Sequence, residues 1–156
     1  LVGLILMALK NDKNKQKLSE RIRYLAATDE LSLIIGLSLL TIGNFLGGVW
    51  ANESWGRYWG WDSKESWSYI TIIIYAIVLH LRFIPRLKNI FTFLVASVLS
   101  FGSVIFTYFG VNFYLSGLHS YANGDGFSVS NLLYLLLMLL ALLIAFAYGG
   151  KDIKEI

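Results

Sequence analysis

The chain has 156 residues, of which 56% are hydrophobic and 15% charged, with a formal net charge of +3. A soluble domain of this length rarely carries so much apolar sequence, so the composition predicts an all-α integral membrane protein. The chain contains no cysteine, which excludes disulfides, thiolate metal sites and a CxxC redox pair within it. Its cations are grouped in short segments between apolar runs, which indicates membrane orientation rather than nucleic-acid binding.

Apolar runs predict four full transmembrane helices, preceded by the end of another. Residues 1–9 are the expected end of a truncated helix, and the full spans are expected at 31–50, 66–83, 90–112 and 130–148. The sequence begins at Leu1 inside an apolar run. We therefore interpret residues 1–156 as a single membrane domain from the C-terminal part of a longer protein.

The segments between the expected spans alternate in charge. Residues 10–23, residues 82–88 and the C-terminal tail are basic, whereas the loops 51–65 and 113–129 have only Arg57 and Lys64 as cations. The positive-inside rule then predicts that the basic segments are cytoplasmic and that both loops face outward. Leu18, Ile22 and Leu25 recur at helical spacing, which predicts either an amphipathic helix on the inner membrane surface or a solvated tether.

Small residues form stripes on two of the expected spans. Gly43 and Gly47 are spaced as in a GxxxG motif, with Gly36 on the same face, and Ala96, Ser100, Ser103, Thr107 and Gly110 repeat in steps of four and three. Small residues allow the backbones of membrane helices to approach closely. These stripes are therefore expected to pack against other helices.

All five tryptophans fall within residues 50–67, which we call the tryptophan segment. Its position between two spans predicts an aromatic platform at the membrane surface, flat enough for a large planar apolar ligand with a charged rim. An interfacial aromatic belt is the alternative. Gly56 and Gly60 permit the tight turns that would bring Trp55, Trp59 and Trp61 together.

Asp62 and Glu65 stand where a helix is expected to begin. Their spacing matches a capping box, with Asp62 as the N-cap and the side chain of Glu65 reaching back. A structural role at the start of the next span is therefore expected for Asp62. That role leaves room for a second one in shaping the tryptophan segment.

The chain has two histidines, and both are candidate metal ligands. His80 lies near the inner end of the second full span, on one helical face with Tyr69, Ile73 and Ala76. His119 lies in the loop 113–129, on the same expected side of the membrane as the tryptophan segment. For His80 a hydrogen bond to a neighbouring helix is the alternative, and for His119 an exposed loop position.

The sequence WGRYWGWDSKESW resembles the WWD motif of the haem-handling proteins of cytochrome c maturation. Within this family it is most similar to the CcsA (ResC) type of cytochrome c synthetase, as are the segments YAIVLHLR and GLHSYA. The resemblance covers essentially the whole chain. Ser63 stands where the family most often has proline, and the chain lacks two further histidines that the family has upstream.

The resemblance implies that haem b is held by residues of the WWD motif and by histidines on both sides of the membrane. His119 would be one of two outward axial ligands to the iron, and His80 one of a pair within the membrane. The motif residues that we expect at the haem are Trp55, Arg57, Tyr58, Trp59, Trp61 and Asp62. Arg57 and Lys64, as the only outward cations, are candidates to meet the haem propionates.

The function implied is haem transport to the outer membrane face and presentation to apocytochrome c, where a CxxCH peptide forms thioethers with the haem vinyl groups. An upstream half or a partner subunit would supply the missing histidines, and the membrane would be a bacterial plasma membrane or a thylakoid membrane. No catalytic residue is expected, because no side chain resembles a poised nucleophile or general base. Two alternatives stay open: a haem chaperone without ligation activity, and an aromatic cage for a quaternary ammonium or lipid headgroup.

Overall fold

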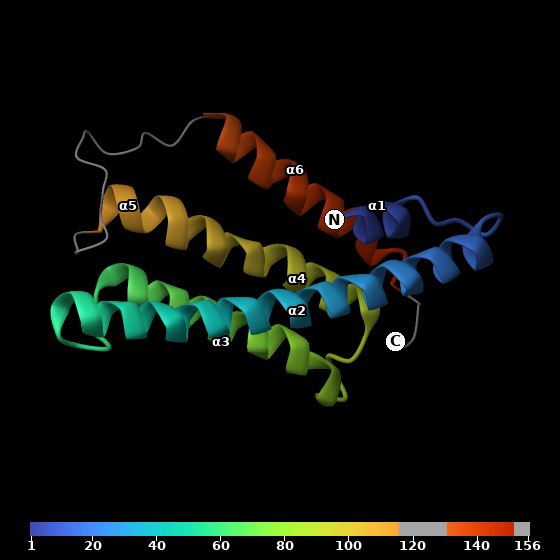
Figure 1. The fold of residues 1–156 in the computed structure, drawn as a ribbon. Coiled ribbons are helices and arrows are strands. Elements are labelled where there is room, and N and C mark those ends of the chain that lie inside the picture. Colours follow the sequence, from blue (N-terminus) through green and yellow to red (C-terminus); the bar gives the residue numbers. More distant parts are fainter. Residues whose placement is uncertain (116–130, 152–156) are drawn as a thin grey trace. The chain divides into compact units, whose positions relative to one another are not determined.

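The computed structural model describes residues 1–115 and 131–151, and most of these residues are helical, with no β-strand among them (Figure 1). Four helical stretches in this part are long and apolar enough to cross a membrane: Lys15–Trp55, Ser63–Phe83, Ile90–Tyr114 and Asn131–Tyr148. Each contains or closely matches one predicted span. The expectation of an all-α membrane protein is confirmed.

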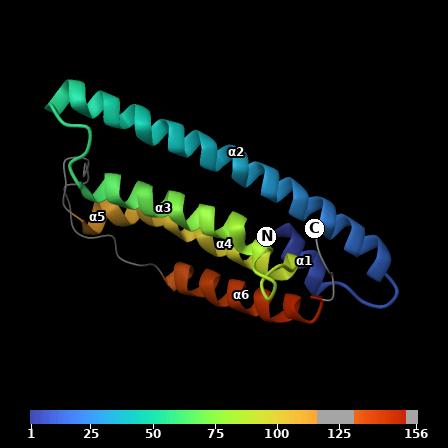
Figure 2. The ribbon, with the colours of Figure 1, turned by 90° about the horizontal axis from the view of Figure 1, so that it is seen from below.

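The helices follow one another in the order α1 (Val2–Ala8), α2 (Lys15–Trp55), α3 (Ser63–His80), η1 (Leu81–Phe83), α4 (Ile90–Ile105), η2 (Phe106–Gly110), α5 (Val111–Tyr114) and α6 (Asn131–Tyr148). The short element η1 is a 3₁₀ turn and η2 is a π-helical segment. The remnant predicted at residues 1–9 corresponds to α1, which lies beside α6 in both ribbon views (Figures 1 and 2).

The basic segment does not form a separate element, in contrast to both predicted alternatives. From Lys15 onward it belongs to α2, which is continuous over 41 residues, whereas residues 10–14 lie in the turn before this helix. At 1.5 Å per residue this helix is about 60 Å long, twice the roughly 30 Å of a bilayer's hydrocarbon core. Residues 15–35 contain neither glycine nor proline, so nothing in the sequence ends the helix between the basic segment and the apolar span.

The turn between α3 and α4 follows from one proline. Pro85 is the only proline of the chain, and Ile84 before it has the extended conformation (φ −94°, ψ 114°) that a following proline favours. This ends η1. The turn is closed by backbone hydrogen bonds from Leu87 and Lys88 to the carbonyl of Ile84, and the Asn89 side chain caps α4 by accepting from the Thr92 N–H at 2.8 Å.

The chain divides into two compact units, and α2, α3 and α4 contribute residues to both. The first unit comprises residues 1–32, 78–99 and 128–156. Its core consists mainly of fully buried aliphatic side chains, contributed by α1, α2, α4 and α6: Leu4, Met7, Ile22, Ala26, Ile90, Leu94 and Ala147. After α6 the backbone of Gly150 approaches Met7 so closely that a Cβ would overlap its carbonyl, which explains glycine there.

The second unit comprises residues 33–77 and 100–127, and hydroxyl groups are buried in it. Thr71 of α3 and Thr107 of η2 share a hydrogen bond at 3.0 Å, and Thr107 also donates to the carbonyl of Ser103 at 2.7 Å. Ser100 and Ser103 are buried on the predicted small-residue stripe of α4. This stripe is packed as expected, with hydroxyls satisfied between or within the helices.

The glycine stripe of α2 behaves differently. A Cβ built at Gly36, Gly43 or Gly47 meets no described atom within 4 Å outside the local turns of α2. Within the described residues this stripe is therefore not a helix-packing surface, contrary to the prediction. Gly43 and Gly47 line a small cavity instead.

Candidate functional site

The tryptophan segment is built on two helix ends and a short connection. Trp50 and Trp55 belong to α2, Trp67 belongs to α3, and only residues 56–62 form the connection. Gly56 follows α2 with φ +71°, a left-handed conformation that lets its N–H bond the Asn52 carbonyl at 2.8 Å. The predicted turn at Gly56 is confirmed. The predicted outward loop is shorter than expected because α2 continues through its first residues.

The start of α3 has the predicted capping box. The Asp62 carboxylate accepts from the N–H of Lys64 at 3.3 Å, and Glu65 accepts from the N–H of Asp62 at 3.3 Å. Glu65 also accepts from the N–H of Gly60 at 2.8 Å. The same carboxylate thus satisfies the first turn of the helix and fixes the connection that carries Trp59 and Trp61.

The indole rings do not form the flat platform that was predicted. Trp59 is edge-on to Trp61, with ring centroids 6.0 Å apart and an interplanar angle of 85°, and edge-on to Tyr69 of α3 at 6.3 Å and 79°. Aromatic pairs favour this geometry because the positive edge of one ring meets the negative face of the other. The three rings therefore form walls at right angles.

The remaining tryptophans are paired elsewhere. Trp50 and Trp55 pair with each other on α2, with ring centroids 5.1 Å apart, and Trp67 packs on Phe106, the first residue of η2, at 4.2 Å. Trp67 therefore serves packing between α3 and the helix that follows. The single cluster of five rings expected from the sequence is divided into three groups.

Trp59, Trp61 and Tyr69 border a groove of about 760 Å³, which we call the aromatic groove. Its other wall is one face of α2, and its lining is almost entirely apolar: Ile42, Asn44, Phe45, Leu46, Gly48, Val49, Tyr58, Trp59, Trp61 and Tyr69. The volume lies within the range of small-molecule and cofactor sites, roughly 300–1,000 Å³. The groove can bury a large apolar ligand against ring faces and edges.

Trp61 has a backbone conformation that is unusual for a large side chain. Its φ is +56°, and its side chain is 78% exposed at the groove. Non-glycine residues adopt this region at a cost of about 1–3 kcal/mol, and such residues cluster at binding sites. The amide hydrogen bonds from Gly60 and Asp62 to Glu65 hold the backbone on both sides of Trp61.

A smaller cavity of about 190 Å³ shares Asn44, Gly48, Tyr58 and Trp59 with the aromatic groove, and we call it the polar cavity. Lys64, Glu65 and Ser68 also line it. Ser68 donates to the side-chain oxygen of Asn44 at 2.9 Å, and the Lys64 ammonium donates to Asn112 at 3.3 Å. One partly buried cation thus stands beside the apolar groove.

The structure brings only part of the predicted site together. Tyr58, Trp59 and Trp61 line the aromatic groove, whereas Trp55 lies on α2 and Asp62 caps α3. Arg57 is exposed, with its guanidinium over Gly60. His119 lies outside the described residues.

His80 is the last residue of α3 and belongs to the other unit, where it is exposed and its ring lies 5.7 Å from that of Phe83. Tyr69, Ile73 and Ile77 of the same helix are also exposed. Within the described residues no three histidine, cysteine or carboxylate side chains form a group that could hold a metal ion. The two histidine roles are thus still predictions.

The α2 wall of the groove was not recognised from the sequence. Ile42, Phe45, Leu46 and Val49 recur at helical spacing and lead directly into the tryptophan segment. This spacing was the available signal. The spacing alone does not identify a groove, because any apolar residue of a membrane span can equally well face lipid.

The sequence of residues 1–119 matches the family described as cytochrome C assembly protein. The chain belongs to this family. It is 58% identical over 123 residues to the protein NrfI of Wolinella succinogenes, a match that covers 79% of this chain and 14% of NrfI. It is 49% identical over 89 residues to the cytochrome c biogenesis protein CcsA of Saccharum officinarum and of Oryza sativa, covering 57% of this chain and 27% of each relative.

These matches confirm the predicted resemblance to the CcsA type of cytochrome c biogenesis protein. The chain spans only about a seventh of NrfI and about a quarter of the CcsA proteins it matches.

Proposed function

We propose that this chain takes part in cytochrome c maturation by holding haem at the outer membrane face for presentation to apocytochrome c. The observation that carries the proposal is the aromatic groove, an apolar space of about 760 Å³ with indole and phenol rings on its rim. Its size and lining suit a porphyrin, which is large, planar and apolar. Membership of the cytochrome c assembly family makes haem the cargo to test first.

In this proposal Trp59, Trp61 and Tyr69 contact the porphyrin through ring faces and edges, and Phe45 and Val49 of α2 exclude water from the opposite side. His119 is proposed as an axial ligand to the iron, and His80 as a ligand of a second haem position within the membrane. The second ligand at each position would come from residues beyond this chain. The cargo proposed is haem b.

The haem propionates are proposed to lie near Lys64. Of the two cations considered from the sequence, Lys64 lines the cavity that adjoins the aromatic groove, whereas Arg57 is exposed on the connection. A partly buried ammonium strengthens a charge-assisted hydrogen bond to a carboxylate. Lys64→Gln should therefore weaken haem binding several-fold, and it should have much less effect on haem dimethyl ester, which has no carboxylate.

Presentation completes the proposed role. The sulfhydryl groups of a CxxCH peptide would add across the two haem vinyl groups, each forming a C–S bond while the hydrogen goes to the other vinyl carbon, so no group leaves. The chain contributes binding and orientation to this step. Whether the complete protein also ligates haem, or acts as a chaperone for another ligase, is tested by adding haem and a CxxCH peptide to it and looking for a covalent product.

The aromatic groove is tested by filling it. In the full-length natural protein, Val49→Trp should lower the haem content of the purified protein several-fold, because the added indole occupies the groove. Ile35→Trp is the matched control, since Ile35 is an exposed residue of the same helix outside the groove. Equal Soret absorbance in both variants and the wild type would argue against the groove as the haem site.

The histidine assignments are tested separately. His119→Ala should shift or bleach the Soret band of haem at the outer site, and His80→Ala should affect a different haem population.

An aromatic cage for a quaternary ammonium group remains a second candidate, because the rings of Trp59, Trp61 and Tyr69 stand at right angles. A cage needs no histidine, so its ligand would stay bound in His119→Ala.

A further inference from the structure

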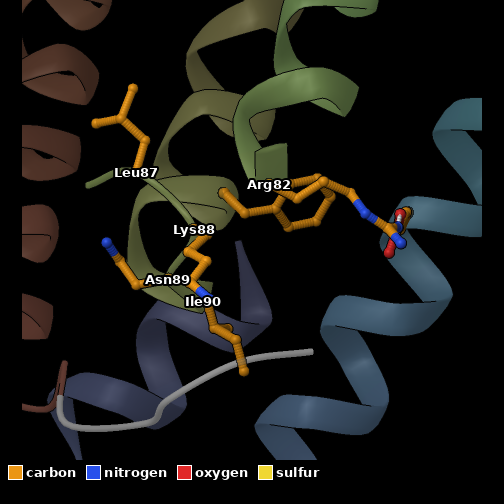
Figure 3. Close-up of a pocket in the computed structure, with 7 residues that line it drawn as sticks. Arg82, Leu87, Lys88, Asn89 and Ile90 are labelled. Carbon is orange, nitrogen blue, oxygen red and sulfur yellow. Dashed lines mark hydrogen bonds and ion pairs between the residues drawn. The ribbon is translucent and has the colours of Figure 1, made fainter. Parts of the chain in front are cut away.

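Several polar side chains of the spans have their partners inside the protein. Arg82 extends from η1 to α2, where it pairs with Glu30 (Figure 3). The hydroxyls of Ser38 and Thr41 each donate to a carbonyl of their own helix, α2, at 2.8 and 2.7 Å. Such pairing is needed in a membrane, because lipid offers no hydrogen-bonding groups to replace it. Asn44, three residues after Thr41, is engaged differently.

The side chain of Asn44 reaches across to another helix. Its amide oxygen accepts from the hydroxyl of Ser68 on α3 at 2.9 Å. The amide nitrogen carries two further N–H groups, and no residue of the described ranges 1–115 and 131–151 accepts from them. The oxygen and nitrogen of an amide lie on opposite branches of one plane, so the nitrogen is turned away from Ser68. Two donors are therefore available to a ligand.

Asn44 stands where the aromatic groove and the polar cavity meet. The two spaces share four lining residues, Asn44, Gly48, Tyr58 and Trp59, and all four belong to the second unit. Among these four, Asn44 alone contributes a side chain from α2. Asn44 is only partly buried, so its donors can be reached from either space. They mark the point at which an almost entirely apolar lining becomes polar.

The depth of Asn44 limits what can reach it. Ser68 is the sixth residue of α3, so the contact lies about 7–8 Å along the helix axis from the start of that helix. A free anion would lose its hydration on moving there. A ligand whose apolar body fills the groove would instead carry its own polar group to this level.

We propose that Asn44 donates from its side-chain amide to one propionate of haem, and so determines which edge of the porphyrin enters the polar cavity. This inference rests on the function proposed above. Lys64 lines the same cavity, whereas the carboxylate of Glu65 accepts from the N–H groups of Gly60 and Asp62. A site that hydrogen-bonds one group of its ligand discriminates against analogues without it, because its donors then lose their acceptor. Asn44 thus makes the site selective for porphyrins with a free carboxylate.

The test uses the full-length natural protein in neutral detergent, freed of haem and titrated with haem or with iron octaethylporphyrin. The second compound has the same macrocycle but only alkyl substituents. Asn44→Leu should weaken haem binding about tenfold, as expected for the loss of a hydrogen bond to a charged group. Its affinity for iron octaethylporphyrin should not fall.

Asn44→Asp is the sharper variant. It keeps the size of the side chain and an oxygen that accepts from Ser68, but it replaces the N–H donors by a carboxylate oxygen that repels a propionate. We expect it to weaken haem binding more than Asn44→Leu does. Thr41→Val is the matched control, because it also removes a polar group from α2 but lines neither space. Its haem affinity should stay within twofold of the wild type.

A spectroscopic readout separates a contact with the propionate from a general effect on folding. The propionate bending bands in the resonance Raman spectrum of bound haem respond to hydrogen bonding at the carboxylate. They should shift in Asn44→Leu and stay unchanged in Thr41→Val. Equal losses of haem and iron octaethylporphyrin in Asn44→Leu would mean a packing defect and would overturn the proposal. Wild-type haem affinity in Asn44→Asp would overturn it as well.

Failure of this inference can be told apart from failure of the proposed function. If Val49→Trp lowers haem binding while Asn44→Leu binds haem like the wild type, the groove still holds haem and only the role of Asn44 is wrong. If Val49→Trp leaves haem binding unchanged, the groove is not the haem site, and both proposals are wrong.

Discussion

Single residues at the start of α3 connect helix stability to the geometry of the groove. Glu65 accepts hydrogen bonds from the N–H groups of Gly60 and Asp62, which lie on either side of Trp61. Trp61 has a positive φ, and the hydrogen bonds on both sides hold its backbone in a conformation that an isolated peptide would avoid. The capping box thus also supports one wall of the candidate binding site.

The N-cap can be tested by truncation. Asp62→Ala in the full-length protein should lower the free energy of unfolding by about 1 kcal/mol, because the N–H of Lys64 loses its acceptor. Asp62→Asn, which keeps a side-chain oxygen, should lose clearly less. The free energies would come from denaturant titrations followed by circular dichroism. Equal losses in both variants would show that the charge of Asp62, and not the cap, is what matters.

Replacing glycine by alanine is expected to change the free energy of unfolding in opposite directions at Gly36, inside α2, and at Gly56, directly after it. Gly56→Ala should cost about 1–2 kcal/mol, because Gly56 has φ +71° and an L-residue is strained there. Gly36→Ala should cost nothing and can add up to about 1 kcal/mol, since Gly36 is inside a helix with open space around it. The same unfolding assay compares the two. A destabilised Gly36→Ala would reveal a helix packed on that stripe in the complete protein.

At the scale of elements, the second unit relies on hydroxyl groups rather than on large apolar side chains. Thr71 is 3% exposed, and its hydroxyl meets that of Thr107 in the π-helical segment η2. In a membrane the association of helices gains little from the hydrophobic effect, because lipid is as apolar as leucine. Small residues and interhelical hydrogen bonds take its place.

The contact between Thr71 and Thr107 can be measured by a double-mutant cycle. Thr71→Val, Thr107→Val and the double variant should give a coupling energy of about 0.6 kcal/mol, the average for hydrogen bonds between membrane helices. Thr41→Val paired with Thr107→Val is the control, because the Thr41 hydroxyl bonds the Leu37 carbonyl of its own helix. A coupling of zero for the first pair would mean that the hydroxyl contact adds nothing to packing.

At the scale of the whole molecule, the expected orientation in the membrane follows from charge alone. The segment between α3 and α4 has three cations, Arg82, Arg86 and Lys88, whereas the connection 56–62 after α2 has one, Arg57. The positive-inside rule predicts that the first lies in the cytoplasm and the second outside. This orientation also underlies the proposed presentation of haem to an outer partner.

The orientation is open to a labelling experiment, because this part of the protein has no cysteine of its own. In a background without other cysteines, Arg57→Cys should react with a membrane-impermeant maleimide added to intact cells. Arg86→Cys should react only after the membrane is permeabilised. Both positions are exposed in the structure, so accessibility to the reagent is not limited by folding. The reverse pattern would invert the proposed topology.

The sequence by itself determined the fold class, the spans and the start of α3. Long apolar runs leave a chain in lipid no alternative to helices, because every backbone N–H and C=O must bond internally. The capping box depends on residues three positions apart, so local sequence is enough to predict it. Family membership was likewise predictable, since it rests on the order of residues around the tryptophan segment.

Only the tertiary structure decided how the aromatic rings are used. Trp67 contacts Phe106, which lies 39 residues further along the chain, and local sequence does not show this contact. The α2 wall of the groove depends on how the connection 56–62 folds back over α2. The continuity of α2 was also missed. Where a basic segment meets an apolar span, the surroundings of the chain change from water to lipid, but the backbone can stay helical. Local sequence specifies hydrogen bonds along a helix, whereas the side chains that meet across helices are chosen by packing in three dimensions.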